Sequence, residues 1–272
     1  MRRGTPLLTV MALLTAAGGP VALALDPLGP PKAGPAAGQF QIGADILYGA
    51  ADVDTHGDYS SRVFQNRVLQ PDQSVSGPAS PFRYKNQRTS KLYANLGYGI
   101  LRNWEAFLRV GGADHGVADQ GVSNGSRLAV GGGTKATFYE TGNWSFGGIL
   151  QLSWAGWEDG YQAESDTISN EHSVTEGQAA LGACYQFSPH FSLYGGPFAT
   201  FYKGTSEMKI TRVLGTTLTI GETSQDTDMD AWFGGYLGLG IQIHEKATAA
   251  IEFQYTPDAY AVAANIAYRF GK

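Results

Sequence analysis

Residues 260–270 alternate strictly between two kinds of side chain, and this alternation constrains the fold more than any other feature of the chain. Because successive side chains of a strand point to opposite faces, the stretch predicts a strand with one apolar and one small or polar face. About ten such residues with aromatics at both ends suit a tilted strand that crosses a bilayer. The apolar set is Tyr260, Val262, Ala264, Ile266, Tyr268 and Phe270, and the other set is Ala261, Ala263, Asn265, Ala267 and Arg269.

The same stretch resembles the closing-strand signal of bacterial outer-membrane β-barrels, which commonly ends in an aromatic residue, most often Phe. One departure is that Gly271 and Lys272 follow Phe270, whereas the signal usually ends on the aromatic residue itself. The resemblance covers about residues 40–270 and concerns the architecture, not one family. It implies an outer-membrane location, recognition of this strand by the barrel-assembly machinery, and surroundings of outer-membrane lipids and lipopolysaccharide.

Composition agrees with a barrel and argues against a helical membrane protein. Glycine occurs 37 times, aromatic residues make up 12% and charged residues 16% of the chain, yet the mean hydropathy is −0.18. A barrel places apolar residues at every second position, so it needs no long apolar run. The net charge of −5 gives no indication of nucleic-acid binding.

The N-terminus has the features of a signal peptide. Two arginines at positions 2 and 3 precede an uncharged stretch, which ends in Ala22-Leu23-Ala24. A Gly-Gly-Pro sequence at 18–20 interrupts the apolar run, which favours cleavage after Ala24 over an uncleaved membrane anchor. We therefore predict a signal peptide at 1–24, a Pro/Gly-rich periplasmic lead-in at 25–38, and a single barrel domain at 39–272.

Ten segments show the period of two that is expected of strands. We predict an all-β, closed antiparallel up-and-down transmembrane β-barrel of about ten strands, with twelve or eight strands as alternatives. Twelve strands would require the segments 208–213 and 216–220 to cross the membrane, and we instead assign this pair to an extension above it. The ten segments are 40–48, 91–100, 104–110, 126–139, 144–157, 176–187, 191–203, 229–243, 247–256 and 260–270.

The connections between these segments are of two kinds. Turns of three or four residues alternate with long polar stretches at 51–88, 114–125, 158–175 and 204–227. Short periplasmic turns and long outer loops are typical of outer-membrane barrels. A secreted soluble β-protein is the alternative, but its strands would need a second sheet to cover so many apolar faces. The aromatic residues expected at the two membrane interfaces are Tyr48, Trp104, Trp144, Phe191, Trp232, Tyr260, Tyr268 and Phe270.

If the apolar face meets lipid, the other face lines the lumen. A barrel of eight to ten strands has an interior little wider than its side chains, so opposite charges there are expected to pair. We favour a lumen plugged by these charges over a narrow solute path that they would make selective. The predicted lumen charges are Asp45, Lys91, Glu105, Arg109, Arg127, Lys135, Glu176, Glu252 and Arg269.

Histidines near acidic residues raise the question of catalysis. His56, His115 and His172 each lie beside Asp or Glu in predicted outer loops, where they could converge on a base or metal site. No H-E-x-x-H, G-x-S-x-G or Gly-rich phosphate loop occurs, however. We therefore predict no catalytic residues, no metal and no cofactor.

The predicted function is a non-enzymatic outer-membrane barrel whose long outer loops serve surface interaction or envelope integrity. A narrow porin for small solutes is the first alternative, and a hydrolase at the outer rim is the second. A local basic cluster at 83–88 would contact the anionic sugar-lipid of the outer leaflet, or would simply be a solvated loop edge.

Overall fold

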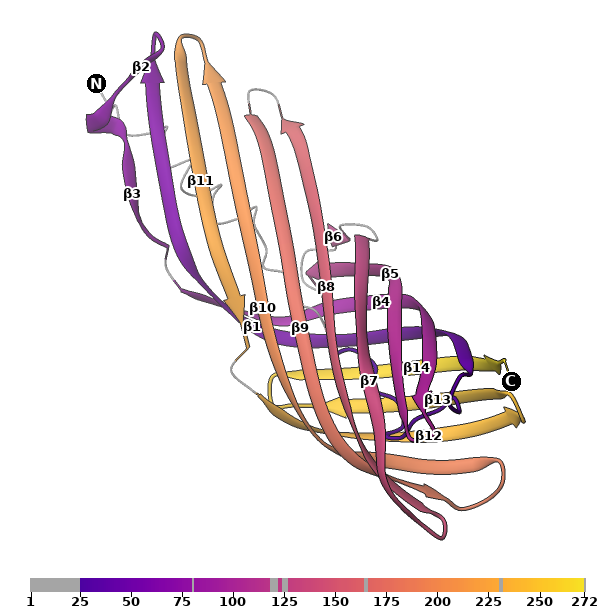
Figure 1. Cartoon of the computed structure of the whole chain (residues 1–272). Coiled ribbons are helices and arrows are strands. Elements are labelled where there is room, and N and C mark those ends of the chain that lie inside the picture. The colour runs from indigo at the N-terminus through magenta and orange to yellow at the C-terminus, as the bar shows by residue number, and fades with distance from the viewer. Residues whose placement is uncertain are drawn as a thin grey trace.

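The computed structural model describes residues 25–79, 81–117, 122–123, 127–163, 166–229 and 232–271, and the predicted signal peptide at 1–24 lies outside these residues. Ten antiparallel strands form a ring (Figure 1). In chain order they are β1 (Phe40–Gln65), β4 (Phe82–Leu101), β5 (Trp104–Val117), β7 (Arg127–Thr141), β8 (Trp144–Ala163), β9 (Asp166–Gln186), β10 (Phe191–Leu214), β12 (Phe233–His244), β13 (Ala247–Tyr255) and β14 (Ala259–Phe270).

Strand β1 closes the ring, because it pairs with β4 on one side and with β14 on the other. Phe40 lies opposite Phe270 of β14 and opposite Tyr98 of β4. The pairing with β14 includes Tyr48, opposite Val262, and continues to Ala51, opposite Ala259. A closed ring leaves no unpaired strand edge facing lipid. The prediction of a closed antiparallel barrel of about ten strands is confirmed, and so is the pairing of 260–270 with 40–48.

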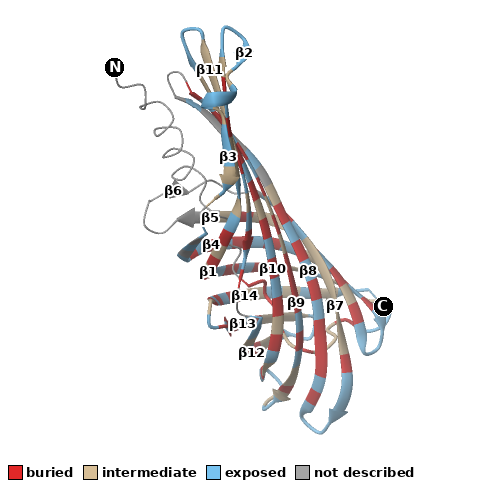
Figure 2. Cartoon of the chain, turned by 90° about the vertical axis from the view of Figure 1, so that its left-hand side faces the viewer, coloured by how far each residue is buried: buried red, intermediate tan, exposed pale blue. Residues whose placement is uncertain are grey.

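The outer surface of the ring is apolar and the inner surface is polar. Ile46, Leu108 and Leu150 point outward and are 60%, 67% and 60% exposed. The inward-pointing Lys91 and Glu176 are each only 2% exposed. Buried and exposed positions alternate along the strands (Figure 2). This distribution is the reverse of that in a soluble protein, and it suits a barrel surrounded by lipid.

The remaining elements are short, apart from one strand. They are β2 (Val68–Leu69), β3 (Val75–Pro78), β6 (Val122–Ser123), the 3-10 helix η1 (Pro71–Gln73), and the longer β11 (Thr217–Asp228). Within the described ranges, no helix has the length and apolar character needed to cross a membrane.

Strands β1, β8, β9 and β10 continue well beyond the ends of β12, β13 and β14 (Figure 1). In this upper part, β11 lies between β1 and β10, the place that β12–β14 take in the ring. The turn from β10 to β11 contains Gly215 with φ of +60°, a conformation that glycine adopts without steric cost. We call residues 54–65, 156–163, 166–173 and 203–228 the extension.

The first correction concerns the predicted long loops, which are largely strands of the extension. Most of 51–88, 158–175 and 204–227 is strand, and only part of it is irregular. The apolar period that marks the other strands is absent here because the outward side chains, such as Glu158 and Glu207, are charged and exposed. The inward positions, such as Ile168 and Ile210, are buried. The predicted pair 208–213 and 216–220 does stand in this extension and not in the ring.

The second correction concerns the N-terminal residues. We call residues 25–34 the inner segment, because they lie inside the barrel and not in a periplasmic lead-in. Leu25 and Leu28 are 1% and 0% exposed. The chain leaves the lumen at the end with the short turns, where Gly38 N–H donates to the Gly99 carbonyl at 2.8 Å, and then enters β1. The Pro/Gly-rich composition excludes regular structure but does not exclude a buried position.

Glycines on the lumen wall make room for this segment. A Cβ atom at Gly99 would overlap the carbonyl group of Ala36, and one at Gly147 would overlap the carbonyl oxygen of Pro31. Other lumen glycines accommodate aromatic rings, since Gly238 faces the ring of Tyr194. The small residues of the lumen therefore serve close packing around the inner segment and not only the stems of long charged side chains.

Candidate functional site: the filled lumen

Three lumen glutamates accept hydrogen bonds from the backbone of the inner segment. The N–H of Asp26 donates to Glu176 Oε1 at 2.8 Å. The N–H groups of Leu28 and Gly29 donate to the two carboxylate oxygens of Glu252, at 3.0 and 2.7 Å. Closer to the short turns, Gly34 N–H donates to Glu105. These bonds supply partners for peptide groups that irregular backbone would otherwise leave unsatisfied in a buried site.

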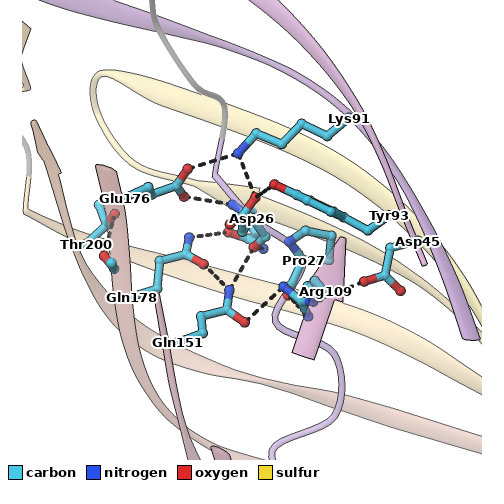
Figure 3. A network of polar contacts seen from close by, with 12 residues as sticks. Asp26, Pro27, Asp45, Lys91, Tyr93, Arg109, Gln151, Glu176, Gln178 and Thr200 are labelled. Carbon is cyan, nitrogen blue, oxygen red and sulfur yellow. Dashed lines mark hydrogen bonds and ion pairs between the residues drawn. The ribbon is translucent and has the colours of Figure 1, made fainter. Parts of the chain in front are cut away.

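Lys91 lies between two carboxylates, one from the inner segment and one from the barrel wall (Figure 3). Its Nζ is 2.6 Å from Asp26 Oδ1 and 3.0 Å from Glu176 Oε2. The hydroxyl of Tyr93 also donates to Asp26 Oδ1, at 3.3 Å. Charge-assisted bonds of this kind are among the strongest in proteins. They fix Asp26 to both β4 and β9.

A layer of amide side chains completes the polar contacts. Gln151 donates to Gln178, whose Nε2 donates to Gln254 Oε1 at 3.2 Å. Gln254 Nε2 in turn donates to the Asp26 carbonyl at 2.7 Å. Arg109 donates to the Pro27 carbonyl at 2.8 Å and to Gln151 at 3.2 Å (Figure 3). Donors and acceptors thus alternate across the lumen, from the wall through the inner segment to the opposite wall.

The predicted lumen charges lie as follows. Asp45, Lys91, Glu105, Arg109, Glu176 and Glu252 are buried inside the ring, Lys135 and Arg269 are partly buried, and the side chain of Arg127 lies outside the described part. The ion pairs between wall residues are Lys91 with Glu176 and Arg109 with Asp45, the latter at 3.4 Å. Most of the remaining bonds of these charges go to the inner segment and not to each other.

Asp26 and the three glutamines are the residues that sequence reasoning missed. The glutamines occupy inward positions of predicted strands, so the period of two could have included them. Asp26 has no such signal, because it stands alone in a Pro/Gly-rich segment. Its one indication is that it is a charged residue at the second position after the predicted cleavage site.

The eight predicted interface aromatics are all exposed on the structure. At the short-turn end they form contacts with further rings: Phe40 lies 5.9 Å from Phe270 and 4.9 Å from Tyr98 between ring centroids. Trp144 lies 4.7 Å from Tyr185 in the same way. That these rings meet lipid headgroups remains a prediction.

The histidines do not share one face of the extension. In the register of the sheet, His56 lies opposite Asp226, which lies opposite Thr205 and then Ser173. His172 is the neighbour of Ser173, so it points to the opposite face from His56. The side chain of His115 lies outside the described part. No group of three or more potential metal ligands of the His, Cys, Asp and Glu types occurs among the described residues.

Within the basic cluster at 83–88, Arg83 forms ion pairs with acidic residues. Arg83 lies 3.2 Å from Asp54 and 2.7 Å from Asp258, with Asp52 at 3.9 Å. These ion pairs link β4 to β1 and to the turn before β14. The guanidinium of Arg83 is therefore engaged within the protein.

Comparisons with known proteins give the same architecture at low similarity. No family model matches the sequence, and no curated protein matches it. The outer-membrane protease OmpT of Escherichia coli is 12% identical, with a TM-score of 0.41, over 90% of this chain and 99% of that one. An outer-membrane channel of Pseudomonas putida F1 is 12% identical, with a TM-score of 0.40, over 90% and 100%. OprG of Pseudomonas aeruginosa is 12% identical, with a TM-score of 0.35, over 88% and 99%.

These structural similarities are too low to support a conclusion about this chain. The class of protein follows instead from the structure of the chain itself. The closed ring, the apolar outer surface and the polar lumen define a β-barrel of the outer-membrane class. A barrel architecture alone does not decide between a catalytic and a transport activity.

Proposed function

We propose that the chain is a non-enzymatic outer-membrane barrel that its own inner segment plugs, and that its extension serves contacts at the cell surface or the integrity of the envelope. The observation that carries this proposal is the set of hydrogen bonds from the backbone of the inner segment to Glu176, Glu252 and Glu105. The plug is thus a polypeptide segment that uses the lumen charges, and not the charges alone.

The energetics favour a seated inner segment. Its removal would leave Glu252 without two backbone donors and Lys91 without one of its two carboxylates. An uncompensated buried charge costs several kcal/mol, on the order of 3–5. Water entering the lumen would offset part of this cost, but the tightly packed glycine contacts would be lost as well. The closed arrangement is therefore the resting state in this proposal.

Further parts of the proposal concern the surroundings of the barrel. The short turns face the periplasm and the extension faces the outside. The exposed aromatics anchor the ring at the lipid interfaces, beside lipopolysaccharide in the outer leaflet. The barrel-assembly machinery recognises the chain through β14.

A narrow channel is the second candidate, and one observation favours it. A cavity of about 280 Å³ lies beside the inner segment and reaches residues of the short turns, so the lumen is not filled along its whole length. A channel would need only a path past the inner segment at its upper end.

Single-channel recording in planar bilayers separates the two candidates. We expect no steady conductance from the full mature chain, and steady conductance from a variant that lacks residues 25–34. Steady conductance of the unmodified chain that changes with Arg109→Gln would reject the plugged barrel.

A tethered variant provides the matched control. The N–H of Ala33 lies 3.0 Å from Thr137 Oγ1, so Ala33→Cys with Thr137→Cys places two thiols where a disulfide can hold the inner segment against β7. If the resting barrel is closed, oxidation changes nothing. If the inner segment opens during conduction, oxidation silences the channel and a reductant restores it.

A further inference from the structure

The cavity beside the inner segment has two unlike walls. Small side chains on β12, β13 and β14, among them Gly240, Ala249 and Ala267, line one wall. Lys135 and Phe107 stand on the other, on β7 and β5, next to Gly29 and Pro30 of the inner segment. The small residues leave the space open, and the charged residues face it.

The charge of the lining is opposite in sign to that of the whole chain. The cationic residues of the lining are Lys32, Arg109, Lys135 and Arg269, and the carboxylates are Asp45, Glu105 and Glu140. The chain as a whole carries a net charge of −5. The lining is thus locally positive by one charge in an acidic protein.

The partly buried Lys135 differs from Lys91, the buried lysine of the lumen. Lys91 has two carboxylates at 2.6 and 3.0 Å. In the described part of the chain, Lys135 makes no ion pair within 4.0 Å. Its ammonium lies 5.8 Å from the centroid of the Phe107 ring. Arg269, which lines the same cavity, donates to the carbonyls of Gly34 and Glu245 and likewise makes no ion pair there.

The carboxylates near the cavity are already engaged. Glu105 accepts the N–H of Gly34. Asp45 lies 3.4 Å from Arg109. Glu252 accepts two backbone N–H groups and Gln254. Glu105 stands opposite Lys135 in the register of β5 and β7, but in the described part of the chain the two side chains make no ion pair within 4.0 Å. The acids around the cavity are thus engaged by donors, whereas Lys135 has no carboxylate in direct contact.

Two donors converge at one point of the inner segment. A Cβ atom on Gly29 would lie 2.8 Å from Lys135 Nζ and 3.8 Å from Asn265 Nδ2, so both nitrogens approach this glycine. Gly29 has φ of +71° and leaves the space beside both nitrogens free of a side chain. An ammonium beside an amide donor is a chemistry that suits an oxyanion.

We propose that this cavity binds a small carboxylate or phosphate anion from the periplasmic side, with the Lys135 ammonium as its counter-charge and the Asn265 amide as a second donor. The cavity volume of about 280 Å³ limits the ligand to a small molecule. The site stands independently of whether the inner segment ever moves, since both nitrogens face the cavity with the segment in place.

Titration calorimetry on the full folded barrel in a neutral detergent tests the site, with inorganic phosphate in one arm and acetate in the other. We expect saturable binding of at least one anion by the unmodified chain, and at least tenfold weaker binding by Lys135→Gln. Lys135→Arg keeps the charge and should keep most of the binding. Lys209→Gln is the matched control, because Lys209 is an exposed lysine of the extension that pairs with Glu222 at 3.5 Å.

Saturable binding of neither anion overturns the proposal, and so does equal binding by Lys135→Gln. Binding of phosphate alone or of acetate alone assigns the ligand chemistry. A second measurement avoids any effect of Lys135→Gln on folding, because it uses the unmodified chain: acetylation of lysine amines, followed by mass spectrometry. The bound anion should slow the modification of Lys135 several-fold and leave Lys209 unchanged, and equal rates at Lys135 with and without anion contradict the site.

Discussion

The ring and the extension are built from the same strands with opposite chemistry on the same faces. On β10, the outward Leu193 and Phe201 of the ring are apolar and exposed, whereas the outward Lys203 and Glu207 of the extension are charged. The inward Met208 and Ile210 of the extension are apolar and buried. The backbone does not change between the two regions. The surroundings change from lipid to water, and the polarity of the outward side chains changes with them.

The reversal marks the level at which the lipid ends. Within the ring, the last outward aromatic of β1 is Tyr48, and Asp52 and Asp54 follow four and six residues later. On β8, Trp154 precedes Glu158 in the same way. The change on β10 falls between Phe201 and Lys203. The following predictions test this contrast between ring and extension, from the largest expected effect to the smallest.

Lys91→Met should produce the largest loss of stability. It removes the ammonium between Asp26 and Glu176 and leaves two buried carboxylates facing each other. We expect a loss of about 3–5 kcal/mol in the free energy of unfolding, as for other buried charges that lose their partner. Urea unfolding in lipid vesicles measures it, and a loss below about 1 kcal/mol would show that the lumen is solvated.

Leu150→Arg should be the next most costly change. This outward residue of β8 lies on the apolar outer surface of the ring, where arginine costs about 2–4 kcal/mol in transmembrane barrels. Glu158→Arg on the same face of the same strand is the control, and it should change the stability by less than about 0.5 kcal/mol because it meets water. Equal effects of the two substitutions would contradict a lipid boundary between them.

Ile210→Val tests the buried inner face of the extension. Ile210 is 1% exposed. Loss of one buried methylene group should cost about 0.5–1.5 kcal/mol. Hydrogen exchange of the β10 and β11 amides measures this locally, and the rates in the ring should stay the same. Faster exchange in the ring as well would mean that the two regions unfold together.

Glu222→Gln should have the smallest effect. Its ion pair with Arg62 lies on the outward face of the extension, with both side chains more than a third exposed. Such pairs contribute about 0–1 kcal/mol and are screened by salt. We expect a change within that range that disappears at high salt, measured by thermal unfolding in detergent. A larger loss would indicate that this face is covered.

The parts of the fold that meet lipid could be predicted, and the parts that do not were harder to predict. In 91–100 and 144–157, lipid imposes an apolar residue at nearly every second position, so the period is unambiguous. In the extension, threonine, serine and glutamine occupy both faces, and the period cannot be seen in hydropathy. Apart from the pair 208–213 and 216–220, the strands there were predicted as loops for this reason.

The charged residues of the lumen wall were predicted from the sequence, but the inner segment that fills the lumen was not. The inward charges were predicted from alternation, and Lys91, Glu176 and Glu252 among them are buried in the structure. The inner segment has no periodicity, and its contacts are set by residues far away along the chain. Asp26 bonds to Glu176, 150 residues later, and Leu28 bonds to Glu252, 224 residues later. No local pattern specifies contacts at such separations.

These separations also bear on the order of folding. Contacts between residues far apart in the sequence pay a large loop-closure entropy before they contribute, so they form late. The partners of the inner segment lie on β9 and β13, and β13 is the penultimate strand. The residues that are synthesised before every strand therefore reach their native contacts only when nearly the last strand is in place.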